Sequence, residues 1–331
     1  MVKYIIKRIL YSILILLVVS MLIYGLVRLM PTDYVDNKLL PMLNQGTVSE
    51  EDITRMKELY GIADNSFAGI VKGYFKWLGS ALTGDLGISF KYSQPVSEVI
   101  SSSMWISFII AALAYVLVYL IAIPLGITSA VKQYSVLDYS VTTFTMIGIS
   151  LPGFFLAQVL IKTFAMDLGW FDPSLGLETT TSMYTGIVKF FDQVWHCILP
   201  MTTLVILSVG GTMRHTRTNT LEVLNADYIR TARAKGLSER AVVYKHVFRN
   251  TMIPMVTMMA GMLPGLFGGA MILETVFGLP GIGKLAYDAL VVGDIPFIMG
   301  YEMFLAILTV IGVLLSDIAY VLVDPRIKLN R

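Results

Sequence analysis

The sequence predicts an all-α membrane protein in which six helices cross the bilayer. Its 331 residues are 56% hydrophobic and only 15% charged, and the mean hydropathy is +0.71. These values lie far outside the range of soluble globular proteins. Long apolar runs also recur along the chain, and each suits a bilayer core of ~30 Å, which takes ~20 helical residues.

The six apolar runs define the predicted spans and the organisation of the chain. They are Ile9–Val27, Ser101–Val131, Tyr139–Ile161, Gln193–Met213, Asn250–Leu273 and Met303–Val323. The second run is longer than one crossing needs, so we expect part of it to extend into the outer interface. The resulting division is a first transmembrane helix (1–30), an extracytoplasmic segment (31–100), a five-helix core (101–323) with a loop at 214–250, and a tail (324–331).

Lysine and arginine predict that both termini face the cytoplasm, because cytoplasmic loops carry an excess of basic residues. The amino end holds Lys3, Lys7 and Arg8, and the loop 214–250 holds eight basic residues against three acidic ones. Segment 31–100 has six basic residues against nine acidic ones, which is typical of the outer side. The amino-terminal apolar run is longer than the core of a signal peptide and no small-residue cleavage site follows it, so a retained helix is predicted.

Segment 31–100 is predicted to form a structured outer cap. Amphipathic stretches at Glu50–Tyr60 and Ile70–Leu82 alternate with turn signals at Pro41, at Gly46 and from Gly84 to Gly87. Such a cap can lie on the membrane surface or receive a partner from outside. The pattern leaves both interpretations open.

The loop 214–250 is the most informative stretch, because it reads as two short helices with defined ends. Asn225 or Asp227 can cap a first helix at 226–235, and Gly236 supplies the left-handed residue that ends it. Ser238 can cap a second helix at 239–249, and Pro254 follows in the next span. The small Ala232 and Ala234 leave room for another surface. A rigid basic helix at a membrane suits the receipt of mechanical work from a partner.

The residues of this loop resemble the EAA loop of ABC importer membrane subunits, whose coupling helix lodges in a groove of the ATPase. The stretches Arg230–Leu237 and Arg249–Pro254 are most similar to the dipeptide and oligopeptide permease family, B type. Arg230-Thr231-Ala232 stands where Glu-Ala-Ala would, so no contact of the family glutamate carries over. The resemblance implies ATPase-coupling roles for Asp227, Arg230, Thr231, Ala232, Arg233, Lys235 and Gly236.

Four more stretches resemble the same family in the same order, so the resemblance covers the chain. They are Tyr4–Pro31, Gly84–Val96, Glu274–Gly283 and Asp324–Ile327. The resemblance implies the type I importer permease fold, in the bacterial cytoplasmic membrane, with both termini inside. The implied partners are a second homologous permease subunit, two cytoplasmic ATPase subunits, an extracytoplasmic solute-binding protein and membrane lipid.

The implied function is ATP-driven peptide import, with nickel, glutathione or another small solute as the alternative cargo. The chain has no P-loop, Gly-x-x-x-x-Gly-Lys-[Ser/Thr], so ATP and Mg are expected on the partner ATPases and no cofactor or enzymatic activity on this chain. A secondary transporter is a remote alternative, since that class usually carries ionisable residues deep in several spans. No basic and aromatic pattern predicts binding to nucleic acid.

Two carboxylates are candidate gate or pathway residues. Glu274 ends the fifth span beside a loop rich in glycine and proline, where it can belong to an outer gate or cap the next short helix. Asp317 lies about 10 Å from the cytoplasmic end of the last span, where it can face a cavity, or face water at the interface and pair with a basic residue of the tail. Cys197 and the three histidines (His196, His215, His246) show no metal-ligand spacing.

Overall fold

The computed structural model describes residues 2–30, 33–44, 49–59, 62–171, 186–260 and 262–323, and within them the regular structure is helical. The helices are α1 (Val2–Arg28), α2 (Tyr34–Asn44), α3 (Glu50–Leu59), α4 (Phe67–Leu82), α5 (Val96–Val131), α6 (Val136–Ser150), α7 (Gly153–Leu160), η1 (Ile161–Asp167), α9 (Gly186–Leu224), α10 (Asp227–Ala234), α11 (Glu239–Ala241), η2 (Val242–Val247), α12 (Phe248–Ala260), α13 (Leu263–Phe267), α14 (Met271–Val276), α15 (Ile282–Val292) and α16 (Ile295–Val323). The predicted tail 324–331 lies outside the described residues.

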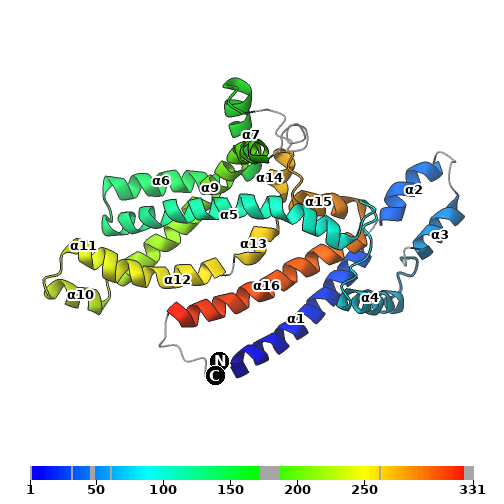
Figure 1. Cartoon of the computed structure of the whole chain (residues 1–331), viewed down its shortest axis with the longest axis horizontal. Helices are drawn as coiled ribbons and strands as arrows, with labels where there is room; N and C mark the ends of the chain where they lie inside the picture. The colour runs from blue at the N-terminus through cyan, green and yellow to red at the C-terminus, as the bar shows by residue number, and fades with distance from the viewer. Residues whose placement is uncertain are drawn as a thin grey trace.

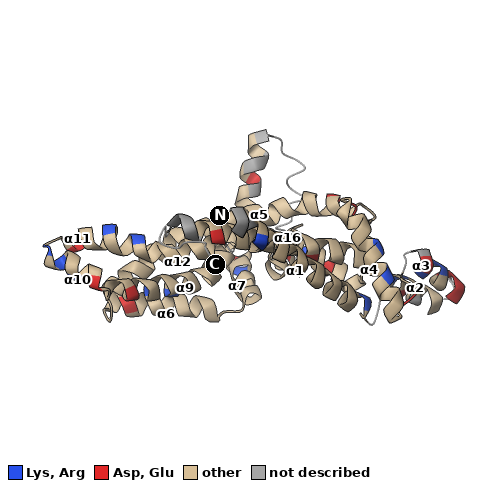
Figure 2. Ribbon diagram, turned by 90° about the horizontal axis from the view of Figure 1, so that it is seen from below, with Lys and Arg blue, Asp and Glu red and all other residues tan. Residues whose placement is uncertain are grey.

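The molecule is elongated, and its two ends carry different segments of the chain (Figure 1). Helices α2, α3 and α4 form one end, while α10 and α11 form the opposite end. Between them, α5 packs along α9, α6 packs on α9, and α16 lies beside α1 and α12. The ribbon between the two ends carries few charged residues (Figure 2), as a bilayer core requires.

Four helices are long and apolar enough to cross a membrane, and two bent pairs bring the number to six if each pair is one span. The single helices are α1, α5, α9 and α16, which contain the first, second, fourth and sixth predicted spans. Helix α5 continues for 36 residues, or about 54 Å. This length exceeds one crossing of the bilayer, as predicted for this span.

The third predicted span, Tyr139–Ile161, is not one helix. Helix α6 ends at Ser150, and the helical segment from Gly153 turns away by 100°. Leu151 has an extended conformation with ψ 132°, and Pro152 follows it. A residue before proline avoids the α region and proline has no N–H to donate, so the helix stops here.

The fifth predicted span, Asn250–Leu273, is also bent, and it begins earlier than expected. A continuous helix from Glu239 to Met259 is followed by the segment Leu263–Val276 at an angle of 53°. Pro264 lies in the first turn of α13, where a missing N–H costs nothing. Pro254 lies inside α12 and neither begins nor breaks it.

The predicted outer segment folds as three helices that pack against α1 and α16. Both amphipathic stretches are helical, as α3 and α4, whereas the expected turn at Pro41 lies inside α2. Gly84 and Gly87 adopt positive φ values of 87° and 90°, which confirms the turn there. Gly46 lies outside the described residues.

Ion pairs and an apolar cluster hold the cap together. Lys57 binds Asp36 at 2.7 Å and Asp33 at 3.3 Å. Tyr74 of α4 is 1% exposed and packs in a cluster with Tyr24 of α1 and Met299 of α16. The cap is therefore a folded part of the chain and not a linker.

Candidate functional site

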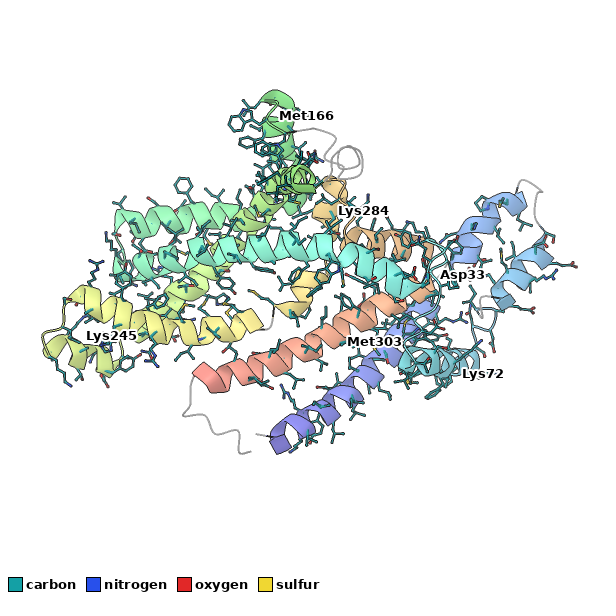
Figure 3. The ribbon with its side chains drawn as sticks, in the orientation of Figure 1. Asp33, Lys72, Met166, Lys245, Lys284 and Met303 are labelled. Atoms are coloured by element: carbon teal, nitrogen blue, oxygen red, sulfur yellow. The ribbon has the colours of Figure 1, made fainter. Side chains whose placement is uncertain are left out.

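The predicted loop 214–250 is helical almost throughout, and α10 sits at its turning point. Helix α9 runs past the expected end of the fourth span to Leu224, so the first part of the loop prolongs a membrane helix. Helix α10 then reverses the chain before it returns through α11, η2 and α12. In Figure 3, Lys245 marks this end of the molecule, and Asp33 and Lys72 mark the opposite end.

A small apolar cluster packs α10 against neighbouring helices of the same chain. Ile229 is fully buried and Ala232 is 6% exposed, and both pack against Val242 and Val247. The side chain of Ala232 faces this cluster, and its contact with a partner stays a prediction. The burial fixes α10 on the helices that precede and follow it, so a force on α10 reaches α9 and α12.

The ends of α10 differ in part from the prediction. Its N-cap is Ala226, without a side-chain hydrogen bond, while the Asn225 Nδ2 group donates to the carbonyl of Leu221 at 3.0 Å. Neither predicted cap is therefore formed. Gly236 has φ +78° as expected, and the Ser238 hydroxyl accepts the N–H of Ala241 at 3.4 Å.

The other predicted coupling residues lie on the exposed side of this unit. Asp227, Arg230, Thr231, Arg233, Lys235 and Gly236 are all exposed. The Arg233 guanidinium donates to both Glu239 carboxylate oxygens, at 2.7 and 3.3 Å, which ties α10 to α11. Tyr228 and Leu237 are 48% and 42% exposed, and sequence reasoning missed these two apolar side chains next to the basic ones.

A buried ion pair that the sequence analysis also missed lies near the α10 end of the molecule, where α5, α6 and α9 meet. Arg217 of α9 donates from Nε and Nη2 to the two oxygens of Asp138, each at 2.9 Å. Asp138 also accepts from the Ser129 hydroxyl and from the Tyr134 N–H. The side chain of Asp138 is 4% exposed. The sequence analysis had counted Arg217 only among the basic residues that predict which loop faces the cytoplasm.

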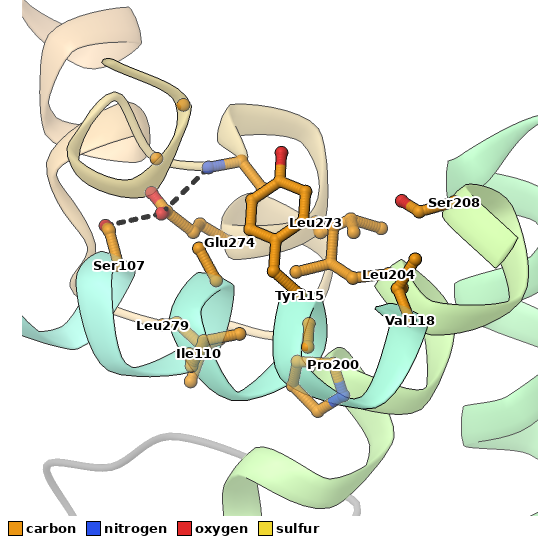
Figure 4. Close-up of a pocket in the computed structure, with 15 residues that line it drawn as sticks. Ser107, Ile110, Tyr115, Val118, Pro200, Leu204, Ser208, Leu273, Glu274 and Leu279 are labelled. Carbon is orange, nitrogen blue, oxygen red and sulfur yellow. Dashed lines mark hydrogen bonds between the residues drawn. The ribbon is translucent and has the colours of Figure 1, made fainter. Parts of the chain in front are cut away.

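Glu274 is buried beside a partly open cavity of about 250 Å³ lined by α5, α9, α13 and α14 (Figure 4). Its Oε1 accepts from the Ser107 hydroxyl at 2.6 Å and from the Ala270 N–H at 3.0 Å. Its Oε2 accepts the Lys284 N–H at 2.8 Å, in the first turn of α15. This contact has the geometry of a cap on the following short helix, one of the two roles considered for Glu274.

Asp317 pairs with the first helix of the chain. Its Oδ2 lies 3.0 Å from Nε of Arg8, and both side chains are partly exposed. The pair joins α16 to α1 near their ends, while the basic tail residues considered as partners lie outside the described residues. The sequence analysis considered a pair between Asp317 and a basic residue. The structure has such a pair, but its basic residue belongs to α1 and not to the tail.

Asp294 is a further buried carboxylate that sequence reasoning missed. It is fully buried, and its Oδ2 accepts from the Ser89 hydroxyl at 2.5 Å and from the Lys91 N–H at 3.0 Å. Its Oδ1 accepts the N–H of Phe297 at 3.2 Å, at the start of α16. The turn that follows the cap is thus fixed to the last helix.

Comparisons with known proteins agree with this architecture. Residues 122–329 match the family model described as "Binding-protein-dependent transport system inner membrane component". The chain belongs to this family. It is therefore a multi-pass membrane component of a bacterial transport system, and the match covers every helix from α6 to α16 and part of α5.

Full-length relatives extend the match to the first helix and the cap. The chain is 38% identical to the oligopeptide transport system permease protein AppB of Bacillus subtilis over 329 residues, 99% of this chain and all of that protein. It is 34% identical to a putative peptide permease protein of Brucella suis over the whole of both chains. It is 31% identical to the oligopeptide permease protein OppB of Haemophilus influenzae, over 99% of this chain and all of that one.

Proposed function

We propose that the chain is one of two membrane subunits of an ABC importer that carries peptides. The observation that carries this proposal is its full-length similarity to permease proteins named for oligopeptide transport. The bent membrane helices and the cavity beside them suit a protein that opens a path between two sides of a bilayer.

The exposed side of α10 is the proposed docking surface for a cytoplasmic ATPase. Basic side chains lie there beside the apolar Tyr228 and Leu237, a mixture common in protein interfaces. The buried Ile229 and Ala232 hold α10 against the neighbouring helices. ATP and Mg act on the partner subunits in this scheme, and this chain supplies no catalytic residue.

The orientation of the chain is proposed with both termini and α10 in the cytoplasm. The excess of basic residues in the loop 214–250 supports this, because such residues stay on the cytoplasmic side. The cap of α2, α3 and α4 then faces outward at the opposite end of the molecule. That surface is available to an extracytoplasmic binding protein that delivers the solute.

A second homologous permease subunit is proposed to complete the importer. The described part of the chain has one proposed docking helix, α10. Two ATPase subunits that hold ATP between them offer two docking grooves. The partner permease supplies the second helix. Loaded binding protein and ATP each shift the complex toward its outward-facing state by binding that state better.

The docking surface is tested by replacing Thr231 with tryptophan. Thr231 is exposed, and its hydroxyl donates only to the carbonyl of Asp227, one turn earlier, at 3.0 Å, so the replacement adds bulk without disturbing the core. The amount of ATPase that copurifies with the chain should fall about tenfold, as expected for a central interface residue.

Thr54 gives a matched control at the other end of the molecule. It is also exposed on a short helix, and its hydroxyl donates to the carbonyl of Glu50 at 3.0 Å. Thr54→Trp should leave ATPase copurification unchanged. If Thr231→Trp also retains the wild-type amount of ATPase, the docking assignment is wrong.

A further inference from the structure

The cavity beside Glu274 is a partly open space within the helical core. Its volume is about 250 Å³, and it lies between α5, α9 and the α13–α14 segment. Protein interiors are close-packed and contain few voids larger than a water molecule. Ala111, Ala114, Gly265 and Ala270 line the walls, and a larger side chain at any of them would occupy the space. Small residues thus keep the cavity open.

Glu274 forms the charged end of the cavity, and its hydrogen bonds within the protein leave the carboxylate unavailable to an incoming ligand. The Glu274 carboxylate binds Ser107 and two backbone N–H groups, and the Ser107 hydroxyl also accepts the N–H of Ile282 at 3.0 Å. A Cβ atom on Gly281 would lie 2.3 Å from the Glu274 carboxyl carbon. The carboxylate therefore packs closely against the turn between α14 and α15.

The rest of the cavity is hydrocarbon with a polar edge. Ile110, Val118, Leu204 and Leu273 supply aliphatic walls (Figure 4). The hydroxyls of Tyr115 and Ser208 line the same space, where they can meet a peptide backbone. Such a lining favours an apolar group, because a charged one would lose its hydration without gaining a counter-ion.

We propose that this cavity is a subsite that receives one apolar side chain of a peptide as it passes through the permease. The inference rests on the proposed peptide transport and adds a preference to it. An apolar cavity of about 150 Å³ binds benzene, and pockets for drug-sized ligands begin at about 300 Å³. The volume here therefore suits an aromatic or branched aliphatic side chain and excludes a whole peptide.

The place of the cavity in the molecule fits this role. It lies between the cap end and the α10 end, beside the bend that separates α12 from α13. Helix α5 forms one wall and runs most of the way between the two ends. A solute that crosses the membrane along this core passes the level of the cavity.

The experiment measures competitive uptake of two tripeptides by the complete importer in proteoliposomes, with its binding protein and ATP. The probes are Ala-Phe-Ala and Ala-Ala-Ala at equal concentration, and the readout is the ratio in which they accumulate. Ala114→Leu fills the cavity and should lower the Phe-to-Ala ratio about tenfold, the discrimination that a hydrophobic pocket gives for a few carbon atoms. Uptake of Ala-Ala-Ala is the reference in each ratio.

A control and a second variant make the result decisive. Ala112→Leu adds the same bulk on α5 at a partly buried position that does not line the cavity, and it should leave the ratio within about twofold of wild type. Leu204→Ala enlarges the cavity and should raise uptake of Ala-Trp-Ala relative to Ala-Ala-Ala, which also decides the matter if Ala114→Leu does not assemble.

The outcomes separate this inference from the function on which it rests. Intact ATP-driven peptide uptake with unchanged ratios in both cavity variants overturns the subsite and leaves the proposed function standing. A wild-type complex that accumulates none of the peptides overturns both.

Discussion

Buried carboxylates fix the ends of the helices in this permease. Asp138, Glu274 and Asp294 are each 3% exposed or less, and each accepts hydrogen bonds from a hydroxyl and from backbone N–H groups. Burying a carboxylate is costly unless it is paired or hydrogen-bonded. Their positions at turns therefore specify how one helix meets the next.

The ion pair of Asp138 and Arg217 gives the sharpest prediction at the residue scale. Asp138→Asn removes the negative charge and leaves the Arg217 guanidinium, with 24% of its side chain exposed, without its partner. Breaking a buried pair in this way costs about 3 kcal/mol or more. We expect a lower midpoint of thermal unfolding for the detergent-purified subunit, followed by tryptophan fluorescence.

A solvent-exposed pair in the same chain is the control for that measurement. Asp167 lies 2.8 Å from Lys162, and their side chains are 54% and 71% exposed. Asp167→Asn should shift the midpoint little, because exposed ion pairs contribute about 1 kcal/mol or less. Equal shifts for the two variants would show that the buried pair does not stabilise the fold.

Sequence reasoning could not find this pair. Asp138 and Arg217 are 79 positions apart, and neither forms a motif with its neighbours. Only the packing of α6 on α9 brings them together. Gly236 and Ser238 were predictable because their roles are local, in a left-handed turn and an N-cap. The burial of Ala232 was not predictable, because a small side chain suits a partner and a core equally well.

At the scale of elements, hydrophobic runs located the spans but not their bends. Pro124 and Pro200 lie inside continuous helices, whereas the helix stops before Pro152. In a membrane, neighbouring helices and local adjustments can satisfy the backbone groups that a proline leaves free. Whether a proline breaks its helix thus depends on packing that the sequence does not display.

The arrangement of the helix ends leads to a prediction about accessibility. In a Cys197→Ser background, a cysteine at Lys235, beside α10, should react with a membrane-impermeant maleimide only when the cytoplasmic face is open. A cysteine at Asn65, beside α4, should react from outside in intact cells. Both positions are exposed, so reactivity reports the side of the membrane. Labelling of Lys235→Cys from outside would reverse the proposed orientation.

On the scale of the whole molecule, three features lie along one axis. The cap occupies one end, α10 occupies the other, and the cavity lies between them within the α5, α9 and α13–α14 core. The buried clusters at α1 and α16 and at α10 fix the two ends to this core. Such an arrangement suits a subunit that receives solute at one end and mechanical work at the other.

The most direct test of the central claim is ATP-driven uptake of a labelled oligopeptide by proteoliposomes containing this chain and its separately encoded partners. The account predicts accumulation only when both permeases, the ATPases, the binding protein and ATP are present, and loss of accumulation when this chain is omitted. Accumulation by this chain without ATPase subunits, or by a homodimer of it with ATPases alone, would contradict the account.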